Sequence, residues 1–257
     1  MRSIALLNQK GGVGKTTTTA NLGASLALLG KKVLVIDMDP QANLSVHLGV
    51  DIHTIKYSVY NILMNTATTS DVLLPTKIPG LDIIPANIDL SGAEIELVGV
   101  VGRETVLKEY VGDIVKQYDY VLVDCPPSLG LLTLNVLTLV DELFIPVQTE
   151  FFALQGVSKL LDTFEVVRKR LNNRLEITGI VLCMYTNRTR LCQEVVDKIK
   201  EHFGDKVFNT MVRKNVKLSE SPSHGKPVIT YAPDSHGAED YMLLAKEVIA
   251  QVIEDKK

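Results

Sequence analysis

Cysteine is scarce in this sequence, which contains only three among its 257 residues. Cys125, Cys183 and Cys192 are widely spaced and form no C-x-x-C pattern. An odd number of isolated cysteines is typical of a reducing compartment and offers neither a disulfide framework nor a zinc site. We therefore expect a cytoplasmic protein without structural disulfides.

Long hydrophobic runs are also absent. The longest apolar run covers residues 129–140 and is interrupted by Thr133, Asn135 and Thr138. A membrane-spanning helix needs roughly 20 consecutive apolar residues. The first seven residues superficially resemble a secretion signal, but their apolar part is too short and meets polar residues instead of a cleavage site. We expect no membrane association.

Positive charge is not in excess, because the formal net charge is −3. The overall charge therefore does not favour nucleic acid. The distribution is uneven, however: residues 168–226 contain 13 Lys or Arg against 6 Asp or Glu, a local balance of +7, so the rest of the chain carries −10. This asymmetry permits a basic face in the later part of the chain.

The sequence has no linker rich in Pro, Gly or Ser, no repeat and no low-complexity tract, so we expect a single domain covering residues 1–257. Short, nearly continuous runs of Val, Ile and Leu alternate with amphipathic segments, which predicts a doubly wound α/β fold: a mainly parallel sheet of about seven strands with helices on both faces. The expected strands are residues 3–8, 32–37, 81–85, 118–124, 142–147, 177–184 and 206–211. The expected helices are residues 16–29, 104–117, 154–171, 191–203 and 237–253.

A glycine-rich segment follows the first expected strand and precedes a helix. Such a turn directs backbone N–H groups toward phosphate oxygens, and the helix N-terminus favours negative charge. In this P-loop pattern Lys15 contacts the β- and γ-phosphates and the Thr16 hydroxyl binds Mg²⁺. We expect ATP to be bound here by Lys10, Gly11, Gly12, Val13, Gly14, Lys15, Thr16 and Thr17.

This segment departs from the strict G-x-x-x-x-G-K-[ST] pattern, because Gln9 occupies the first glycine position and a second lysine, Lys10, follows it. The alternative is the G-x-G-x-x-G fingerprint of dinucleotide-binding folds. That fingerprint needs a glycine where Thr17 stands and has no role for Lys15. The sequence therefore favours a P-loop.

Carboxylates follow two other expected strands. Asp37 and Asp39 come at the end of one, and Asp124 ends another after four apolar residues, as in a Walker B motif. An isolated Asp in such a position more often caps a helix, but ligands of doubly wound sheets bind at the carboxyl ends of the strands, beside the P-loop. We expect Thr16, Asp37 and Asp124 to hold Mg²⁺.

Together these segments resemble the ParA/Soj family of bacterial partitioning ATPases, within the MinD/ParA superfamily. The resemblance covers about residues 2–250. It rests on the deviant Walker A segment Lys10-Gly11-Gly12-Val13-Gly14-Lys15-Thr16-Thr17, on Asp37-Met38-Asp39-Pro40-Gln41, on Asp124-Cys125-Pro126-Pro127-Ser128-Leu129-Gly130, and on the late segment of residues 215–227.

The resemblance implies a mechanism. ATP would close two subunits face to face, with Lys10 of each reaching the nucleotide of the other, as an arginine finger does. Lys10, Lys15 and Asp39 would be catalytic, and Asp39 would orient the attacking water. The closed homodimer would bind double-stranded DNA without sequence preference on the nucleoid, until a ParB-like protein stimulated hydrolysis and released it.

The resemblance also suggests positions for adenine and DNA. The family usually has Pro-Arg-Asn where this chain has Arg213-Lys214-Asn215, so the base site departs from its pattern. The expected base contacts are Met184, Val212, Arg213 and Asn215. The expected DNA contacts are Arg188 and Lys217, joined by Arg190 and Lys214.

Other function classes remain open. A MinD-like ATPase would bind a membrane through a basic amphipathic helix at its C-terminus, but residues 244–257 are acidic to neutral. A nitrogenase-type reductase would need cysteines that bridge an iron–sulfur cluster between subunits, and a metabolic ligase or kinase would need a co-substrate pocket. A nucleotide-gated scaffold would bind ATP with scarcely any turnover, although the presence of Lys10 and Asp39 argues for hydrolysis.

Overall fold

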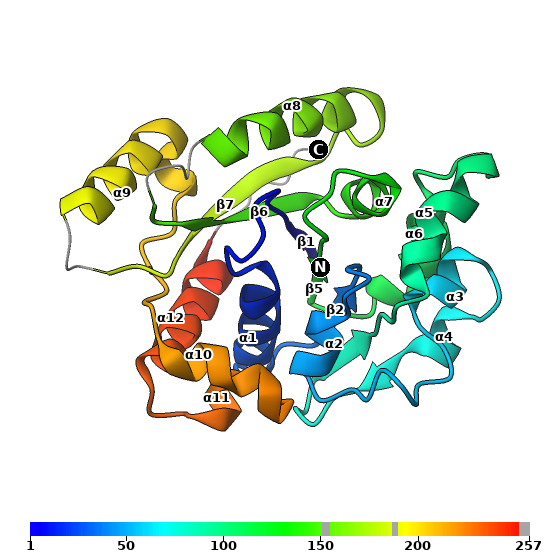
Figure 1. Ribbon diagram of the computed structural model, residues 1–257, viewed down its shortest axis with the longest axis horizontal. Coiled ribbons are helices and arrows are strands. Elements are labelled where there is room, and N and C mark those ends of the chain that lie inside the picture. The colour runs from blue at the N-terminus through cyan, green and yellow to red at the C-terminus, as the bar shows by residue number, and fades with distance from the viewer. Residues whose placement is uncertain (151–154, 187–189, 252–257) are drawn as a thin grey trace.

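The computed structural model describes residues 1–150, 155–186 and 190–251, and a seven-stranded sheet forms its centre (Figure 1). The strand order is β3-β4-β2-β5-β1-β6-β7, and every neighbouring pair is parallel except β3 and β4. The predicted doubly wound, mainly parallel sheet is confirmed. The strands are β1 (Arg2–Leu6), β2 (Val33–Asp37), β3 (Leu74–Pro75), β4 (Leu81–Ile84), β5 (Tyr120–Asp124), β6 (Glu142–Gln148) and β7 (Glu176–Cys183).

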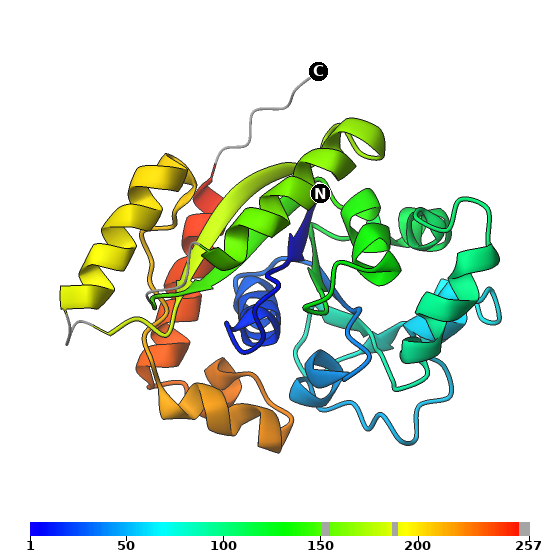
Figure 2. The same cartoon turned by 45° about the horizontal axis from the view of Figure 1, so that its top comes forward.

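Helices cover both faces of the sheet, with α1 and α12 on one side and α7 and α8 on the other (Figures 1 and 2). The five predicted helices are present, with ends within three residues of those expected. The α-helices are α1 (Lys15–Leu28), α2 (Asn43–His47), α3 (Val59–Leu63), α4 (Thr69–Val72), α5 (Leu90–Glu96), α6 (Val106–Val115), α7 (Leu131–Leu139), α8 (Gln155–Arg170), α9 (Arg190–Phe203), α10 (Val216–Glu220), α11 (Val228–Tyr231) and α12 (His236–Ala250). The 3₁₀ helices are η1 (Leu97–Gly99), η2 (Gly204–Lys206) and η3 (Ser221–His224). None of the helices in the described residues is long and apolar enough to cross a membrane.

The hydrophobic core consists of one cluster on each face of the sheet. Successive residues of a strand point to opposite faces, and on β1 Ile4 and Leu6 join the cluster that contains α1 and α12. Ala5 and Leu7 join the cluster on the other face. This explains why the strand sequences are continuously apolar: each residue is covered by one helical layer or the other.

The predicted strand at residues 206–211 is wrong. Residues 204–206 form η2, and Val207 makes only an isolated bridge to Ile180. The backbone N–H groups of Asn209 and Thr210 donate to the Glu247 carboxylate of α12 (2.7 and 2.9 Å). These donors are therefore satisfied by a side chain instead of by a neighbouring strand. The seventh strand is the two-residue β3 at the opposite edge of the sheet.

A glycine on β7 allows aromatic side chains to pack against the sheet. A Cβ at Gly179 would lie 2.5 Å from a Phe208 ring atom and 2.6 Å from a Phe144 ring atom. We expect Gly179→Ala to lower the free energy of unfolding by about 1–3 kcal/mol, because the two packed rings must shift. Urea denaturation would measure this loss.

Gly112, in the middle of α6, is the matched control, because a Cβ there meets nothing within 4 Å. Gly112→Ala should leave the protein as stable or raise its stability by up to about 1 kcal/mol. Equal effects of the two substitutions would contradict the packing argument.

Candidate active site

The loop between β1 and α1 curves around an open space at the carboxyl end of the sheet. Gly12 and Gly14 have φ of 73° and 99°, values that favour glycine, and α1 begins at Lys15 directly after Gly14. Asn8 fixes the start of the loop, because its Nδ2 donates to the Pro146 carbonyl (2.8 Å) and its Oδ1 accepts from the Lys10 N–H (3.0 Å). The loop has the form predicted for binding phosphate.

Lys15 is buried beneath this loop. Its Nζ donates to the carbonyl of Lys10 across the loop (3.3 Å). Burial lowers the pKa of Lys15, and the negative charges of Asp124 and Asp39 oppose that effect. A buried ammonium group at the centre of a ring of backbone N–H groups is well placed to bind an anion.

Thr16 and Asp124 are hydrogen-bonded to each other. The Thr16 hydroxyl donates to Oδ2 of Asp124 (2.6 Å), and the Thr19 hydroxyl donates to Oδ1 (3.4 Å). Asp124 is completely buried, and its pKa is raised well above its usual value by burial and by the neighbouring charge of Asp37. Thr16 and Asp124 therefore present their oxygens at one point, and their role as ligands of Mg²⁺ stays a prediction.

Asp37 lies beside Asp124, because the two residues are paired in the register of β2 and β5. Both of its oxygens accept hydrogen bonds: Oδ1 from the Asp39 N–H (3.2 Å), and Oδ2 from the backbone and hydroxyl of Ser45 (2.9 and 2.7 Å). Burial raises its pKa to about 6. Asp37 is thus adjacent to the expected metal position and also fixes α2 through Ser45.

Asp39 is half-buried and faces the open space of the loop. Its Oδ1 accepts a hydrogen bond from the Gln41 N–H (2.9 Å), which shapes the turn that contains Pro40. Its negative charge acts on Lys15 and on Asp124. The carboxylate is therefore close to the phosphate-binding lysine, in the region expected for a catalytic group.

Lys10 is the exposed lysine of the loop. Its Nζ lies 3.0 Å from a carboxylate oxygen of Glu150 and 3.3 Å from the side-chain oxygen of Gln148. The ion pair is solvent-exposed on both sides. Such pairs contribute about 0–1 kcal/mol, so Lys10 is held only weakly within its own chain.

The loop opens into a cavity of about 540 Å³, a size typical of small-molecule sites. Its walls come from six parts of the chain: the P-loop with the start of α1, the loop after β2, α2, the loop after β5, the residue that follows β7, and η3. The lining residues are Gly11, Gly12, Gly14, Lys15, Thr16, Thr17, Asp39, Asn43, Val46, His47, Pro127, Met184, Pro222 and Ser223. Val13, by contrast, is buried in the core.

Of the four expected base contacts, the structure places only Met184 in the cavity wall. Val212 is buried and continues the hydrogen bonding of β7 through the Leu182 carbonyl (2.8 Å). The Asn215 side chain caps α10. Arg213 is bound to two carboxylates of α12, which raise its pKa. These three positions are used for structure in this state, and their contact with a base stays a prediction.

The expected DNA contacts lie in the later part of the chain. Arg188 falls outside the described residues, and Arg190 is the first residue of α9. Lys214 is exposed. Lys217 is the basic residue of α10, where its Nζ forms an ion pair with Glu220 (2.8 Å).

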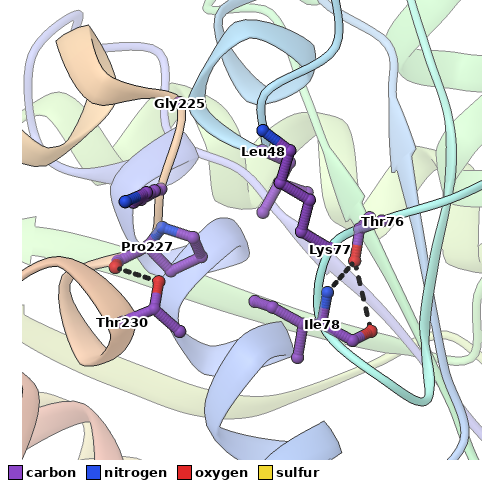
Figure 3. A pocket seen from close by; sticks show the side chains of 8 residues that line it. Leu48, Thr76, Lys77, Ile78, Gly225, Pro227 and Thr230 are labelled. Atoms are coloured by element: carbon purple, nitrogen blue, oxygen red, sulfur yellow. Dashed lines mark hydrogen bonds between the residues drawn. The ribbon is translucent and has the colours of Figure 1, made fainter.

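A second, smaller cavity of about 150 Å³ lies near the first (Figure 3). It is lined by Leu48, Thr76, Lys77, Ile78, Gly225, Lys226, Pro227 and Thr230. The hydroxyls of Thr76 and Thr230 are engaged in local turns, with Ile78 and Pro227 respectively. The polar groups therefore stabilise loops, and the larger cavity is the candidate active site.

Sequence reasoning missed α2 and its contacts. His47 of α2 is buried, burial lowers its pKa to about 4, and its Nε2 lies 3.3 Å from the Ser221 hydroxyl. The available signal was the polar segment Ser221-Pro222-Ser223-His224, to which no contact could be assigned. A five-residue helix is too short to show a helical periodicity in the sequence, so it could not be predicted.

The residues fit a magnesium–nucleotide complex. Lys15 and the loop N–H groups provide positive charge for phosphates, and two buried carboxylates with raised pKa values lie next to each other, so a divalent cation would relieve their repulsion. Thr16 supplies a neutral oxygen at the same position. Among the described residues, no group of three His, Cys, Asp or Glu side chains could hold a metal on its own. Phosphate oxygens and water must therefore supply the remaining ligands, as in other Mg²⁺ sites.

The paired carboxylates predict a pH-dependent stability in the absence of nucleotide and Mg²⁺. The pKa of Asp37 is raised from 3.8 to about 6 in the folded protein. The folded state therefore binds a proton more tightly than the unfolded chain. The contribution of Asp37 to the free energy of unfolding is present below pH 4 and is lost as the pH rises to 6. Relative to Asp37→Asn, the wild type should lose about 2–3 kcal/mol over this range.

Urea unfolding of both proteins in EDTA at pH 4, 5, 6 and 7 would measure that difference. Asp82→Asn on β4 is a control carboxylate, because Asp82 is only half-buried and is hydrogen-bonded to Tyr118. A constant difference between wild type and Asp37→Asn across these pH values would show that the pKa of Asp37 is not raised in the folded protein.

The chain is similar to known proteins along nearly its whole length. The family model described as "AAA domain" matches residues 1–177. The sporulation initiation inhibitor protein Soj of Bacillus subtilis (strain 168) is 52% identical over 247 residues, which cover 96% of this chain and 98% of that protein. The chromosome partitioning protein ParA of Caulobacter vibrioides is 48% identical over 253 residues, which cover 98% of this chain and 95% of that protein.

A similar solved structure is the cobyrinic acid a,c-diamide synthase from Mycobacterium smegmatis with bound ADP and magnesium. It superposes with a TM-score of 0.85 at 35% identity and covers 96% of this chain and 94% of that one. The sequence relatives match nearly the full chain, including the P-loop and the late segment. This chain belongs to the ParA/Soj family of partitioning ATPases.

Proposed function

We propose that the chain is a Mg²⁺-dependent ATPase that partitions DNA through an ATP-dependent homodimer. The observation that carries the proposal is the combination of one buried and one exposed lysine on the same loop. Lys15 lies under the phosphate-binding N–H groups, whereas Lys10 lies at the rim, exposed and weakly held. An ordinary P-loop needs only the lysine at the position of Lys15.

ATP binding rests on the loop and on α1. Gly11, Gly12 and Gly14 of the loop and the first residues of α1 line the cavity, and Lys15 supplies positive charge there. Thr16 and Asp124 would hold Mg²⁺, directly and through water respectively. Bound there, Mg²⁺ neutralises negative charge that develops on the phosphate oxygens.

Lys10 acts across the dimer interface. Its exposed pair with Glu150 contributes little, so the lysine can exchange that carboxylate for the phosphates of a second subunit. A charge supplied in trans during phosphoryl transfer raises turnover by about 10³- to 10⁵-fold in related chemistry. The exchange couples hydrolysis to dimer formation.

Asp39 orients the water that attacks the γ-phosphate of ATP. Its carboxylate lines the cavity beside Lys15 and is held by the Gln41 N–H, which leaves a carboxylate oxygen to orient the nucleophile. Hydrolysis by such a site is slow until a partner completes it. The partner proposed here is a ParB-like protein.

The ATP-bound dimer binds double-stranded DNA through phosphate contacts. Lys214 is exposed, and Lys217 is paired with Glu220 on the surface of α10, so DNA phosphates would compete for its ammonium group. Arg188 and Arg190 precede and begin α9 in the same basic part of the chain. Contacts of this kind bind nonspecifically, which suits association with the nucleoid.

A MinD-like membrane-binding ATPase is the alternative. That function would require an apolar face for lipid on the last helix, but most apolar residues of α12, including Tyr241, Leu244 and Val248, are buried against the rest of the fold. Sedimentation with anionic liposomes and ATP would distinguish the two functions. ATP-dependent sedimentation with lipid but not with DNA would favour the MinD-like one.

The two lysines and Asp39 should have separable roles. We expect Lys15→Ala to lose ATP binding, because the buried charge beneath the phosphates is gone. Lys10→Ala should bind ATP but hydrolyse it poorly, since its charge acts in trans. Asp39→Ala should bind ATP and dimerise, with turnover reduced by about two orders of magnitude. Titration calorimetry, light scattering and phosphate release would measure the three properties.

Lys31→Ala is the matched control, because Lys31 follows α1 at the end remote from the loop. It should behave as the wild type. Wild-type hydrolysis by Lys10→Ala would refute action in trans, and a monomeric Asp39→Ala in ATP would show that Asp39 serves the fold of the turn instead of the chemistry.

DNA binding should depend on salt and on ATP. Each Lys lost per subunit removes two phosphate contacts from a dimer, so the slope of log affinity against log salt should fall by about 1.8. We expect Lys214→Ala and Lys217→Ala each to lower this slope while leaving ATP affinity unchanged. Fluorescence anisotropy with duplex DNA between 50 and 200 mM salt would measure it.

Lys116→Ala is the control, because Lys116 follows α6 and is paired with Asp113 outside the basic segment. A salt slope unchanged in both lysine variants would place the DNA surface elsewhere on the protein.

A further inference from the structure

Helix α5 and the turn η1 have apolar residues on two opposite sides. Leu90, Ala93 and Leu97 are buried in the core cluster and recur at helical spacing. A second series in the same stretch of chain is exposed: Ile88 before the helix, Ile95 on α5, Val98 on η1 and Val101 beyond η1 have exposed fractions of 65%, 79%, 58% and 100%.

These four exposed residues define the α5 ridge. Ile88 lies in the turn before the helix, Ile95 lies on α5 itself and Val98 lies on η1, and all three side chains are exposed. A single exposed apolar residue needs no explanation, whereas several in one short stretch of chain mark an interaction surface. The core already covers the other side of α5, so the ridge contributes nothing to folding.

Carboxylates border the α5 ridge on both flanks. Asp89 and Glu96 lie one helical step to one side of the Ile88–Ile95 row, and Glu94 lies to the other. Glu96 is exposed and accepts the Tyr60 hydroxyl (3.2 Å). An apolar row between acidic flanks matches a partner segment whose apolar side chains alternate with Lys or Arg.

Glu94 connects the α5 ridge to the active site. A Cβ added at Gly130 would overlap its carboxylate, so the side chain lies directly against that glycine. Its Oε1 is buried and has no hydrogen-bond partner among the described residues. Gly130 ends the segment that begins at Asp124 and precedes α7, and Pro127 in the middle of that segment lines the nucleotide cavity.

A second copy of this chain is a poor occupant. A twofold contact between two α5 ridges would place the same carboxylates against each other, and like charges brought together oppose association. An anionic membrane would be repelled by the same groups. The α5 ridge and α10 also lie at opposite ends of the molecule in both views (Figures 1 and 2), so a protein on α5 leaves Lys217 accessible to DNA.

We propose that the α5 ridge is the docking site of the activating protein, which binds it through a basic, apolar segment and acts on hydrolysis through Glu94 and residues 124–130. This inference rests on the proposed function, because it assigns a surface to the partner that stimulates the ATPase. A partner that displaces the Glu94 side chain moves Gly130 and thereby the loop that follows Asp124.

Site-specific cross-linking tests the surface without reference to activity. The native cysteines Cys125, Cys183 and Cys192 are all buried, so a cysteine introduced by Val101→Cys can be labelled selectively with benzophenone maleimide. We expect it to cross-link, in ATP, to the purified ParB-like protein of the same genome. Leu243→Cys, exposed on α12, is the control and should not cross-link.

Measurements of ATP turnover test whether docking at the α5 ridge stimulates hydrolysis. The double substitution Ile95→Ser and Val98→Ser should keep basal hydrolysis and ATP-dependent DNA binding, but raise the ParB-like protein concentration for half-maximal stimulation by at least about tenfold. Val166→Ser, on the exposed side of α8, is the matched control. Glu94→Gln should retain the cross-link and lose most of the stimulation.

The outcomes separate the two proposals. If the ParB-like protein stimulates the wild type and the double variant equally, the docking surface is wrong and the proposed function stands. If it stimulates neither and does not cross-link at position 101, partner activation itself fails, and this inference fails with it. Loss of ATP-dependent dimerisation or of sedimentation with phosphatidylglycerol vesicles in the double variant would assign the α5 ridge to self-association or to lipid.

Discussion

Two buried carboxylates next to each other determine the arrangement of the site. The order β2-β5-β1 places Asp37, Asp124 and the P-loop at adjacent strand ends. Two buried acids at one point are costly when both are ionised, and the raised pKa values of both groups express that cost. Lys15 and two hydroxyls reduce it only in part. The arrangement of these groups therefore suits a cation and, with it, a phosphate.

The same strand ends explain why so much of the site could be predicted from sequence. In a doubly wound sheet, the segments after β1, β2 and β5 must meet, whatever lies between them in the chain. Motif and strand end alone predict Lys15, Thr16, Asp39 and Asp124, and in the structure the first three line one cavity while Asp124 is hydrogen-bonded to Thr16. The motifs and the strand order there reflect one physical requirement, that the phosphate-binding groups lie at neighbouring strand ends.

Features decided by side-chain partners could not be predicted. The segment of residues 206–211 has the composition of a strand, but the Glu247 carboxylate takes its N–H groups. Arg213 has the charge of a DNA or base contact, but Asp240 binds its guanidinium and backbone. In both cases the partner lies on α12, 38 residues further along the chain for Asn209 and 27 for Arg213. Local pattern carries no information about such contacts.

The short helix α2 joins the catalytic strand end to the late segment of the chain. Ser45 binds Asp37, while His47 contacts Ser221. Just beyond α2, Gly49 packs against Gly225 so closely that a Cβ on either glycine would lie 2.9 Å from the other's backbone. Contacts between backbones cannot adjust as flexible side chains do. Through these contacts α2 connects the end of β2 to η3, which forms part of the wall of the nucleotide cavity.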